Sequence, residues 1–174
     1  MRFIRKILNG TFLEGTALFT SVLKWIFLAT ITGVIVGLST AFFLKILRIS
    51  SEFTSHHNFY FLLLPIGLFL SSLMIKYLAS EAEGHGTEKV IEAVHKRTGK
   101  ITAQAIPVKL IATVITIASG GSVGKEGPAA QIGAGITSVF ADIMRFRAED
   151  RKKLVICGIS AGFSAVFGTP IAGA

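Results

Sequence analysis

Long uncharged apolar stretches constrain this chain more than any other feature of its sequence. Two of them, 25–43 and 59–75, hold 19 and 17 residues, and a third fills 154–174. A helix needs about 20 apolar residues to cross a hydrocarbon core of about 30 Å. Only 16% of the residues are charged, whereas soluble domains carry roughly a quarter. We therefore expect an all-α integral membrane protein.

The distribution of basic residues predicts how the chain is oriented. One group precedes the first apolar run and another follows the second: Arg2, Arg5, Lys6 and Lys24, then Lys76, Lys89, Lys96, Arg97, Lys100 and Lys109. Two spans return the chain to its starting side, so the positive-inside rule predicts a cytoplasmic N-terminus. A short outer loop would then hold Lys45, Arg48, Glu52, His56 and His57. Nucleic-acid binding is not expected, because the phenylalanines fall mostly in apolar runs rather than on a stacking platform.

The order of apolar and polar segments predicts the elements of the chain. Residues 1–24 form a cytoplasmic or interfacial segment, expected as an amphipathic helix, and 25–174 the N-terminal part of a transmembrane domain. Helices are expected over about 24–47, 59–78, 101–119, 128–144 and 154–167, with a short helix after Gly84-His85-Gly86 and a charged loop over 142–153. Because 171–174 resembles the first turn of a further helix, we expect the chain to be a fragment.

The stretch 110–140 is apolar but cannot form one straight helix. Five residues that disturb helices fall within nine positions: Gly120, Gly121, Gly124, Gly127 and Pro128. Proline removes a backbone donor and suits the first turn of a new helix. Interrupted helices occur at membrane depth only where they line a cavity or are buried in protein, a pattern typical of transporters and channels.

The helix ends created by these breaks should attract an anion. A helix N-terminus offers free N–H groups and a partial positive charge, and such ends are expected after 84–86, after 124–127 and at Pro170. The lone carboxylate of Glu126 lies at the second of these ends. A charge at the centre of a membrane-spanning helix costs roughly 2.5–3.5 kcal/mol, so an acidic residue in such a segment is a functional candidate. Glu126 could occupy the site of a free anion until an anion or a proton displaces it. It could instead be an ordinary acidic residue at a helix end, or pair with Lys125.

Three short motifs follow one another along the chain: Gly-His-Gly-Thr-Glu-Lys-Val at 84–90, Gly-Lys-Glu-Gly-Pro at 124–128, and a stretch at 162–173 that ends in Pro-Ile-Ala-Gly. In this order they resemble motifs of the CLC family of chloride channels and proton/chloride exchangers. The first resembles the family's Gly-Ser-Gly-Ile-Pro-Glu-Val motif, the second its gating motif, and the third its stretch ending in Pro-Leu/Ile-Ala-Gly. The specific resemblance covers about 83–174.

The resemblance implies a CLC-type bundle of tilted and broken helices, here the first inverted repeat only. It implies that Glu126 is the gating glutamate, and that backbone near two groups of residues binds the anion: Lys125 and Gly127, and Gly84, His85 and Gly86. Residues at helix breaks or lining the pore would be Gly124, Pro128, Phe167 and Pro170. The implied protein is a homodimer in the cell membrane that carries chloride, with protons as a second partner.

Two points stay open within this resemblance. His85 stands where many members have an anion-coordinating serine, so the preferred anion is open, with chloride the default. The inner proton-relay glutamate of the family would come after Ala174, so proton/chloride exchange and passive conduction are not separated. The isolated fragment itself is expected neither to fold stably nor to conduct.

Other classes of protein are disfavoured by particular residues. A phosphate-binding loop of an enzyme would need glycine at 119 and serine or threonine at 126, where the chain has Ser119 and Glu126. We expect no enzyme activity. The adjacent His56 and His57 point apart on a regular element and lack a third ligand, and Cys157 is a lone cysteine in an apolar run. No metal and no cofactor are expected. A small membrane scaffold that does not transport remains the alternative.

Overall fold

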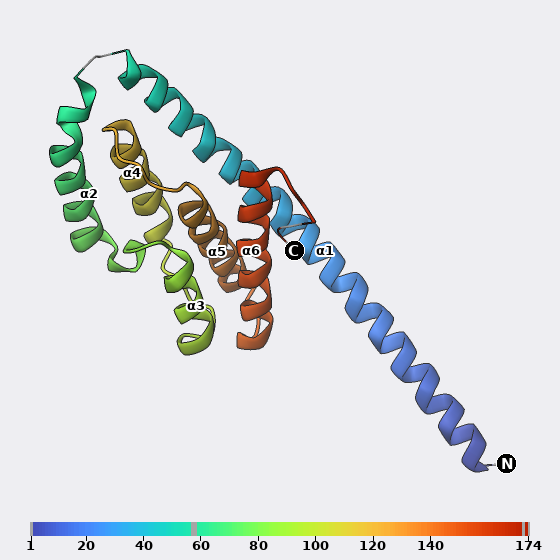
Figure 1. The fold of residues 1–174 in the computed structure, drawn as a ribbon. Coiled ribbons are helices and arrows are strands. Elements are labelled where there is room, and N and C mark those ends of the chain that lie inside the picture. Colours follow the sequence, from blue (N-terminus) through green and yellow to red (C-terminus); the bar gives the residue numbers. More distant parts are fainter. Residues whose placement is uncertain (1, 57–58, 172, 174) are drawn as a thin grey trace. The chain divides into compact units, whose positions relative to one another are not determined.

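The computed structural model describes residues 2–56, 59–171 and 173, with side chains described over 18–54, 56, 59–171 and 173. This described part contains helices and no strand, which confirms the all-α prediction. The elements in chain order are α1 (Arg2–Ser55), η1 (Tyr60–Leu63), α2 (Leu64–Leu78), η2 (Ser80–Ala82), α3 (Thr87–Lys96), α4 (Ala105–Ala118), α5 (Glu126–Ile143) and α6 (Ala148–Phe167) (Figure 1).

The chain divides into two compact units, 1–31 and 32–174, and α1 runs through the boundary between them. The first unit is the N-terminal part of α1, whose described side chains are mostly exposed, Leu18 and Phe19 among them. The second unit holds the rest of the chain and its buried core. All of the site described below lies within 32–174.

Helix α1 is longer than its sequence predicted. We expected a span over 24–47 followed by an outer loop, but the helix continues to Ser55, so that Lys45, Arg48 and Glu52 lie on its last turns. The first 55 residues contain no proline, and an isolated glycine costs a helix only about 1 kcal/mol. His56 follows the helix, and His57 lies outside the described residues.

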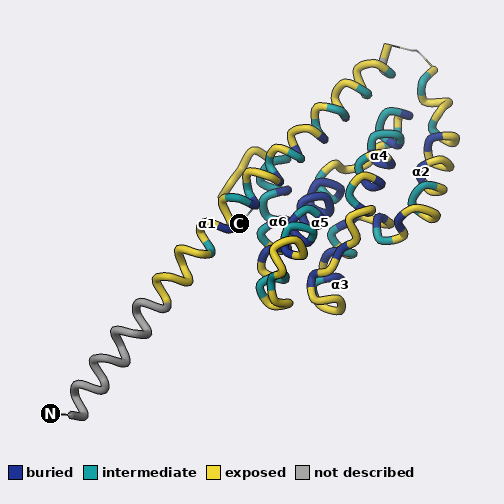
Figure 2. The backbone as a smooth tube through the Cα atoms, turned by 180° about the vertical axis from the view of Figure 1, so that it is seen from behind, coloured by how far each residue is buried: buried dark blue, intermediate teal, exposed yellow. Residues whose placement is uncertain are grey.

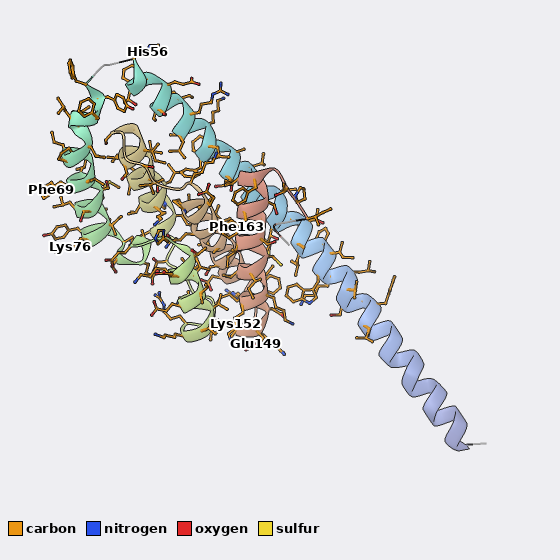
Figure 3. The ribbon with its side chains drawn as sticks, viewed as in Figure 1. His56, Phe69, Lys76, Glu149, Lys152 and Phe163 are labelled. Atoms are coloured by element: carbon orange, nitrogen blue, oxygen red, sulfur yellow. The ribbon has the colours of Figure 1, made fainter. Side chains whose placement is uncertain are left out.

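Two helical segments are long and apolar enough to cross a membrane, judged by length and composition. They are Leu18–Thr54, with a mean hydropathy of 2.1, and Tyr60–Leu78, with 1.9. Pro65 lies in the first turn of α2, where its missing N–H leaves no helical hydrogen bond unmade. The apolar side chains of α2 are largely exposed in the described chain, and Phe69 points away from the neighbouring helices (Figure 3).

The core of the second unit is built around α5, which is the most buried helix (Figure 2). Helix α6 approaches it through small residues: a Cβ added to Gly158 would lie 2.6 Å from the carbonyl oxygen of Gly133. Close backbone contact of this kind is how helices pack in membranes. Phe43 and Leu47 of α1 also pack with Ala129 and Ile132 of α5 in one apolar cluster. Both α1 and α6 therefore contact α5.

Two of the predicted boundaries were wrong around α5 and α6. The charged loop expected over 142–153 is only 144–147, because α6 begins at Ala148 with two acidic residues in its first turn, Glu149 and Asp150. Acidic side chains there are stabilised by the helix dipole, and Glu149 pairs with Lys152 at 3.3 Å (Figure 3). Helix α5 begins at Glu126, two residues before the expected Pro128.

Candidate functional site

The site begins with a glycine turn that directs the N-terminus of α3. Gly84 and Gly86 have φ values of +76° and +92°, in a region that residues with a Cβ rarely adopt. Gly86 is the residue that precedes the first turn of α3, and no side chain caps this helix end. The first backbone N–H groups of α3 therefore have no partner within the helix. His85, between the two glycines, is exposed.

The N-terminus of α5 meets this turn in direct backbone contact. A Cβ added to Gly127 would overlap the carbonyl oxygen of His85 and lie 3.1 Å from its carbonyl carbon. A Cβ added to Gly86 would lie 2.7 Å from the carbonyl oxygen of Gly127. Glycine is required at both positions because the backbones come closer than any side chain allows. Two of the three predicted helix ends are thus brought together.

A cavity of about 460 Å³, here called the His85 cavity, lies where these two helix ends meet. It is lined by Gly84, His85, Thr87, Lys109, Ser122, Val123, Gly124, Glu126, Gly127, Pro128 and Phe163. Two helix dipoles and one lysine contribute positive potential, and a single carboxylate contributes negative charge. The arrangement favours a small anion, since a cation would face positive ends from two directions.

Glu126 is the first residue of α5, and its carboxylate has no hydrogen bond or ion pair to any described residue. It folds back toward Gly124, where an added Cβ would lie 2.5 Å from Glu126 Oε2. The ion pair with Lys125 that the sequence left open is not present among the described residues. The carboxylate also lines a second cavity, together with Lys125 and Arg48. Glu126 therefore lies in the wall between two cavities.

Lys109 is the charged residue of the site that sequence reasoning missed. We counted it only as a basic residue that orients the chain. Its side chain is 5% exposed, and its Nζ donates to the carbonyl oxygens of Ala82, at 2.9 Å, and Gly84, at 2.6 Å. The signal that could have identified it is a single lysine in the apolar run 101–119, because a lone charge at membrane depth is a functional candidate by default.

A polar cluster around Glu81 of η2 links it to Arg97 at the end of α3, to Thr102 and to Gln131 of α5. Partial burial disfavours the charged form of Glu81, but its carboxylate accepts from the amide and hydroxyl of Thr102, at 2.9 and 2.7 Å, and from Arg97. These donors outweigh the burial and lower the pKa of Glu81. Gln131 of α5 donates to the carbonyl oxygen of Glu81 at 2.6 Å, and its own Oε1 is buried without a partner in the described structure.

Two other predicted residues lie away from these cavities. Phe167 ends α6 and is 59% exposed, and Pro170 follows the left-handed Gly168 in an exposed turn. In their place α6 contributes Phe163 to the His85 cavity (Figure 3). Gly173 N donates to Thr169 O at 3.2 Å, as in a single helical turn, while Ala172 and Ala174 lie outside the described residues. No cluster of three or more His, Cys, Asp or Glu side chains in the described part could hold a metal ion.

Comparison with known proteins identifies the family. Residues 66–174 match the family described as voltage gated chloride channel. The chain belongs to the CLC family of voltage-gated chloride channels. As a CLC chain it is 33% identical over 161 residues to a "Chloride/fluoride channel protein" of Pseudomonas syringae, covering 92% of this chain and 35% of the relative.

Other CLC relatives show similar coverage. An uncharacterised protein of Methanocaldococcus jannaschii is 30% identical over 153 residues, which is 88% of this chain and 36% of that protein. An "H(+)/Cl(-) exchange transporter ClcA" of Salmonella typhi is 31% identical over 164 residues, which is 85% of this chain and 34% of the transporter. The chain thus spans about a third of the length of the relatives it matches. The match to the family model begins at Ile66 and includes α3 to α6, the helices that build the His85 cavity.

Proposed function

We propose that this chain contributes the anion path of a membrane protein that carries chloride or a related small anion. The observation that carries the proposal is the His85 cavity, where the N-termini of α3 and α5 meet around an unpartnered Glu126. The relatives' printed names, a chloride/fluoride channel and a proton/chloride exchanger, support the same substrate class. Lys109 adds a fixed positive charge at the wall, which offsets part of the cost of removing an anion from water.

Glu126 acts as a gate in this proposal. Its carboxylate and a free anion carry the same charge and are attracted by the same free N–H groups, so the two compete for the end of α5. A proton on the carboxylate removes its charge and releases the helix end to the anion. Because Glu126 borders both cavities, movement of its side chain would connect or separate them.

The test of the gate is the substitution Glu126→Gln in the protein expressed from its complete gene and reconstituted into liposomes. Glutamine has nearly the same shape but cannot ionise, so chloride flux should lose its dependence on pH. The matched control is Glu88→Gln, the same chemical change on an exposed residue in the first turn of α3. Glu88→Gln should keep the pH dependence of the wild type. An unchanged pH profile in Glu126→Gln would refute the assignment.

Exchange and passive conduction are distinguished by one further measurement. A chloride gradient across the liposome drives protons uphill through an exchanger but not through a channel. One relative is named a channel and the other an exchanger. We favour exchange because protonation of Glu126 is already part of the proposed gate. Chloride flux with no accompanying proton movement would select the channel.

The remaining properties that we propose concern the whole protein. It works without enzymatic chemistry, as a homodimer, in the cell membrane with its N-terminus in the cytoplasm. The cytoplasmic N-terminus is supported by the basic residues before the first span and after the second, as the positive-inside rule requires. Protease accessibility of an N-terminal tag in oriented vesicles tests the orientation, and cross-linking in membranes tests the dimer.

A further inference from the structure

A second cavity also has Glu126 in its lining. It has a volume of about 570 Å³ and is here called the Arg48 cavity. Its lining comes from the last turns of α1, the end of α4 and the loop before α5: Leu44, Leu47, Arg48, Ser51, Ile117, Val123, Gly124, Lys125 and Glu126. Val123, Gly124 and Glu126 line both cavities, which therefore adjoin along this short segment.

The charges of the Arg48 cavity are two cations and one carboxylate. The side chain of Lys125 has no hydrogen bond or ion pair to a described residue. Arg48 pairs with Glu52, Nε to Oε1 at 2.7 Å, but the two side chains are 81% and 61% exposed. Solvent screens an ion pair as exposed as this one, so Arg48 can leave Glu52 for an anion in the cavity at little cost.

The walls of the cavity increase the effect of these charges. Four of its lining residues are apolar: Leu44, Leu47, Ile117 and Val123. Apolar walls of low dielectric concentrate the field of one sign of charge within a cleft and raise the local concentration of counter-ions. When Glu126 is protonated, both remaining charged residues of the lining are positive. The cavity therefore attracts anions most strongly when the proposed gate is neutral.

We propose that the Arg48 cavity is an entry site that collects small monovalent anions from water and delivers them to Glu126, with Arg48 as its capturing residue. This inference rests on the proposed function. It assigns a role to a residue of α1 outside the three motifs that carry the family resemblance. Arg48 acts on the rate of anion entry rather than on the anion bound at the helix ends.

The experiment compares Arg48→Gln with Lys45→Gln in the protein expressed from its complete gene. Lys45 lies three residues earlier on α1, is exposed, and does not line the cavity, so it controls for loss of one positive charge. At low ionic strength, where the Debye length is about 30 Å at 0.01 M, Arg48→Gln should raise the half-saturating chloride concentration about threefold. Flux at saturating chloride should be unchanged, which also shows that the variant is folded.

Two further measurements make the test specific. Glu52→Gln removes the competing carboxylate, so it should lower the half-saturating chloride concentration, opposite in sign to Arg48→Gln. Raising the salt with an inert anion to about 0.15 M, where the Debye length is about 8 Å, should shrink both effects. Equal behaviour of Arg48→Gln and Lys45→Gln, or an effect that persists in high salt, overturns the entry site while chloride flux in the wild type upholds the proposed function. A wild type without chloride flux overturns both.

Discussion

Replacing Lys109 by methionine separates the electrostatic role of a buried cation from its structural one. Methionine follows the unbranched stem of lysine as far as Cε, with sulfur in place of Cδ, and lacks the amino group. That group donates to the carbonyl oxygens of Ala82 and Gly84, and a buried acceptor that loses its donor costs about 1–3 kcal/mol. The change also removes a buried charge, whose desolvation costs several kcal/mol. The two terms largely cancel, so stability should change little.

The loss of attraction between Lys109 and a bound anion has no opposing contribution, so Lys109→Met should weaken anion binding. A cavity of about 460 Å³ has the volume of a sphere about 5 Å in radius, so a central anion lies about 6 Å from a charge in its wall. At an effective dielectric constant of about 20 the attraction is about 2–3 kcal/mol. Because the cavity is open to water, we expect the loss to be smaller, but still about tenfold in affinity, which is about 1.4 kcal/mol.

The assay is titration calorimetry of chloride into the detergent-solubilised protein expressed from its complete gene, with a thermal scan of each variant. Lys109→Met should bind chloride about tenfold more weakly, with a melting temperature close to that of the wild type. Lys109→Arg keeps the charge and should bind within about threefold of the wild type. Equal losses in both variants would mean that Lys109 acts by shape alone, and unchanged binding in Lys109→Met would refute its electrostatic role.

Two further predictions concern the contacts that build the site. Gly127→Ala should destabilise the protein by about 1–3 kcal/mol, as overpacking does, because its Cβ would overlap His85 O. The matched control in thermal unfolding is Gly37→Ala, whose Cβ meets nothing within 4 Å in the described chain. Equal stability of the two variants would contradict the contact. Glu81 has a lowered pKa in the folded protein, so its stabilisation is present above the ordinary glutamate pKa of about 4.3 and is lost as the pH falls through the folded value. Glu81→Gln should therefore be less stable at pH 7 and lose less stability than the wild type between pH 5 and pH 3, which the same scans measure; parallel losses would argue against this linkage.

Local sequence predicted the helical segments because their causes are local. An apolar run long enough to cross a membrane forms a helix there, because the backbone must satisfy its own hydrogen bonds. The breaks at 84–86 and 120–128 follow from glycine and proline themselves. The errors were also local in origin. The charges of 142–153 and of 45–52 were interpreted as loops, although Ala148 to Lys153 are good helix residues and nothing stops α1 before Ser55.

The residues of the site were predicted in part, from helix ends and from the family resemblance. Gly84, His85, Gly124, Glu126, Gly127 and Pro128 do line one cavity, while their roles in binding and gating stay predictions. The role of Lys109 was not predicted because its partners, the carbonyl oxygens of Ala82 and Gly84, lie 27 and 25 residues earlier in the chain. A position on a helix does not indicate which distant backbone atom a side chain will reach.

The sequence by itself determined that the chain is helical, apolar and interrupted at glycine and proline, since these properties depend on neighbouring residues and on transfer of side chains from water. Only the tertiary structure decided that His85 and Gly127 touch, and that Glu126 stands between a cavity with Lys109 and a cavity with Arg48. The reason is that such contacts are fixed by how α1, α4 and α5 pack, and packing depends on the shapes of whole helix faces rather than on any single segment.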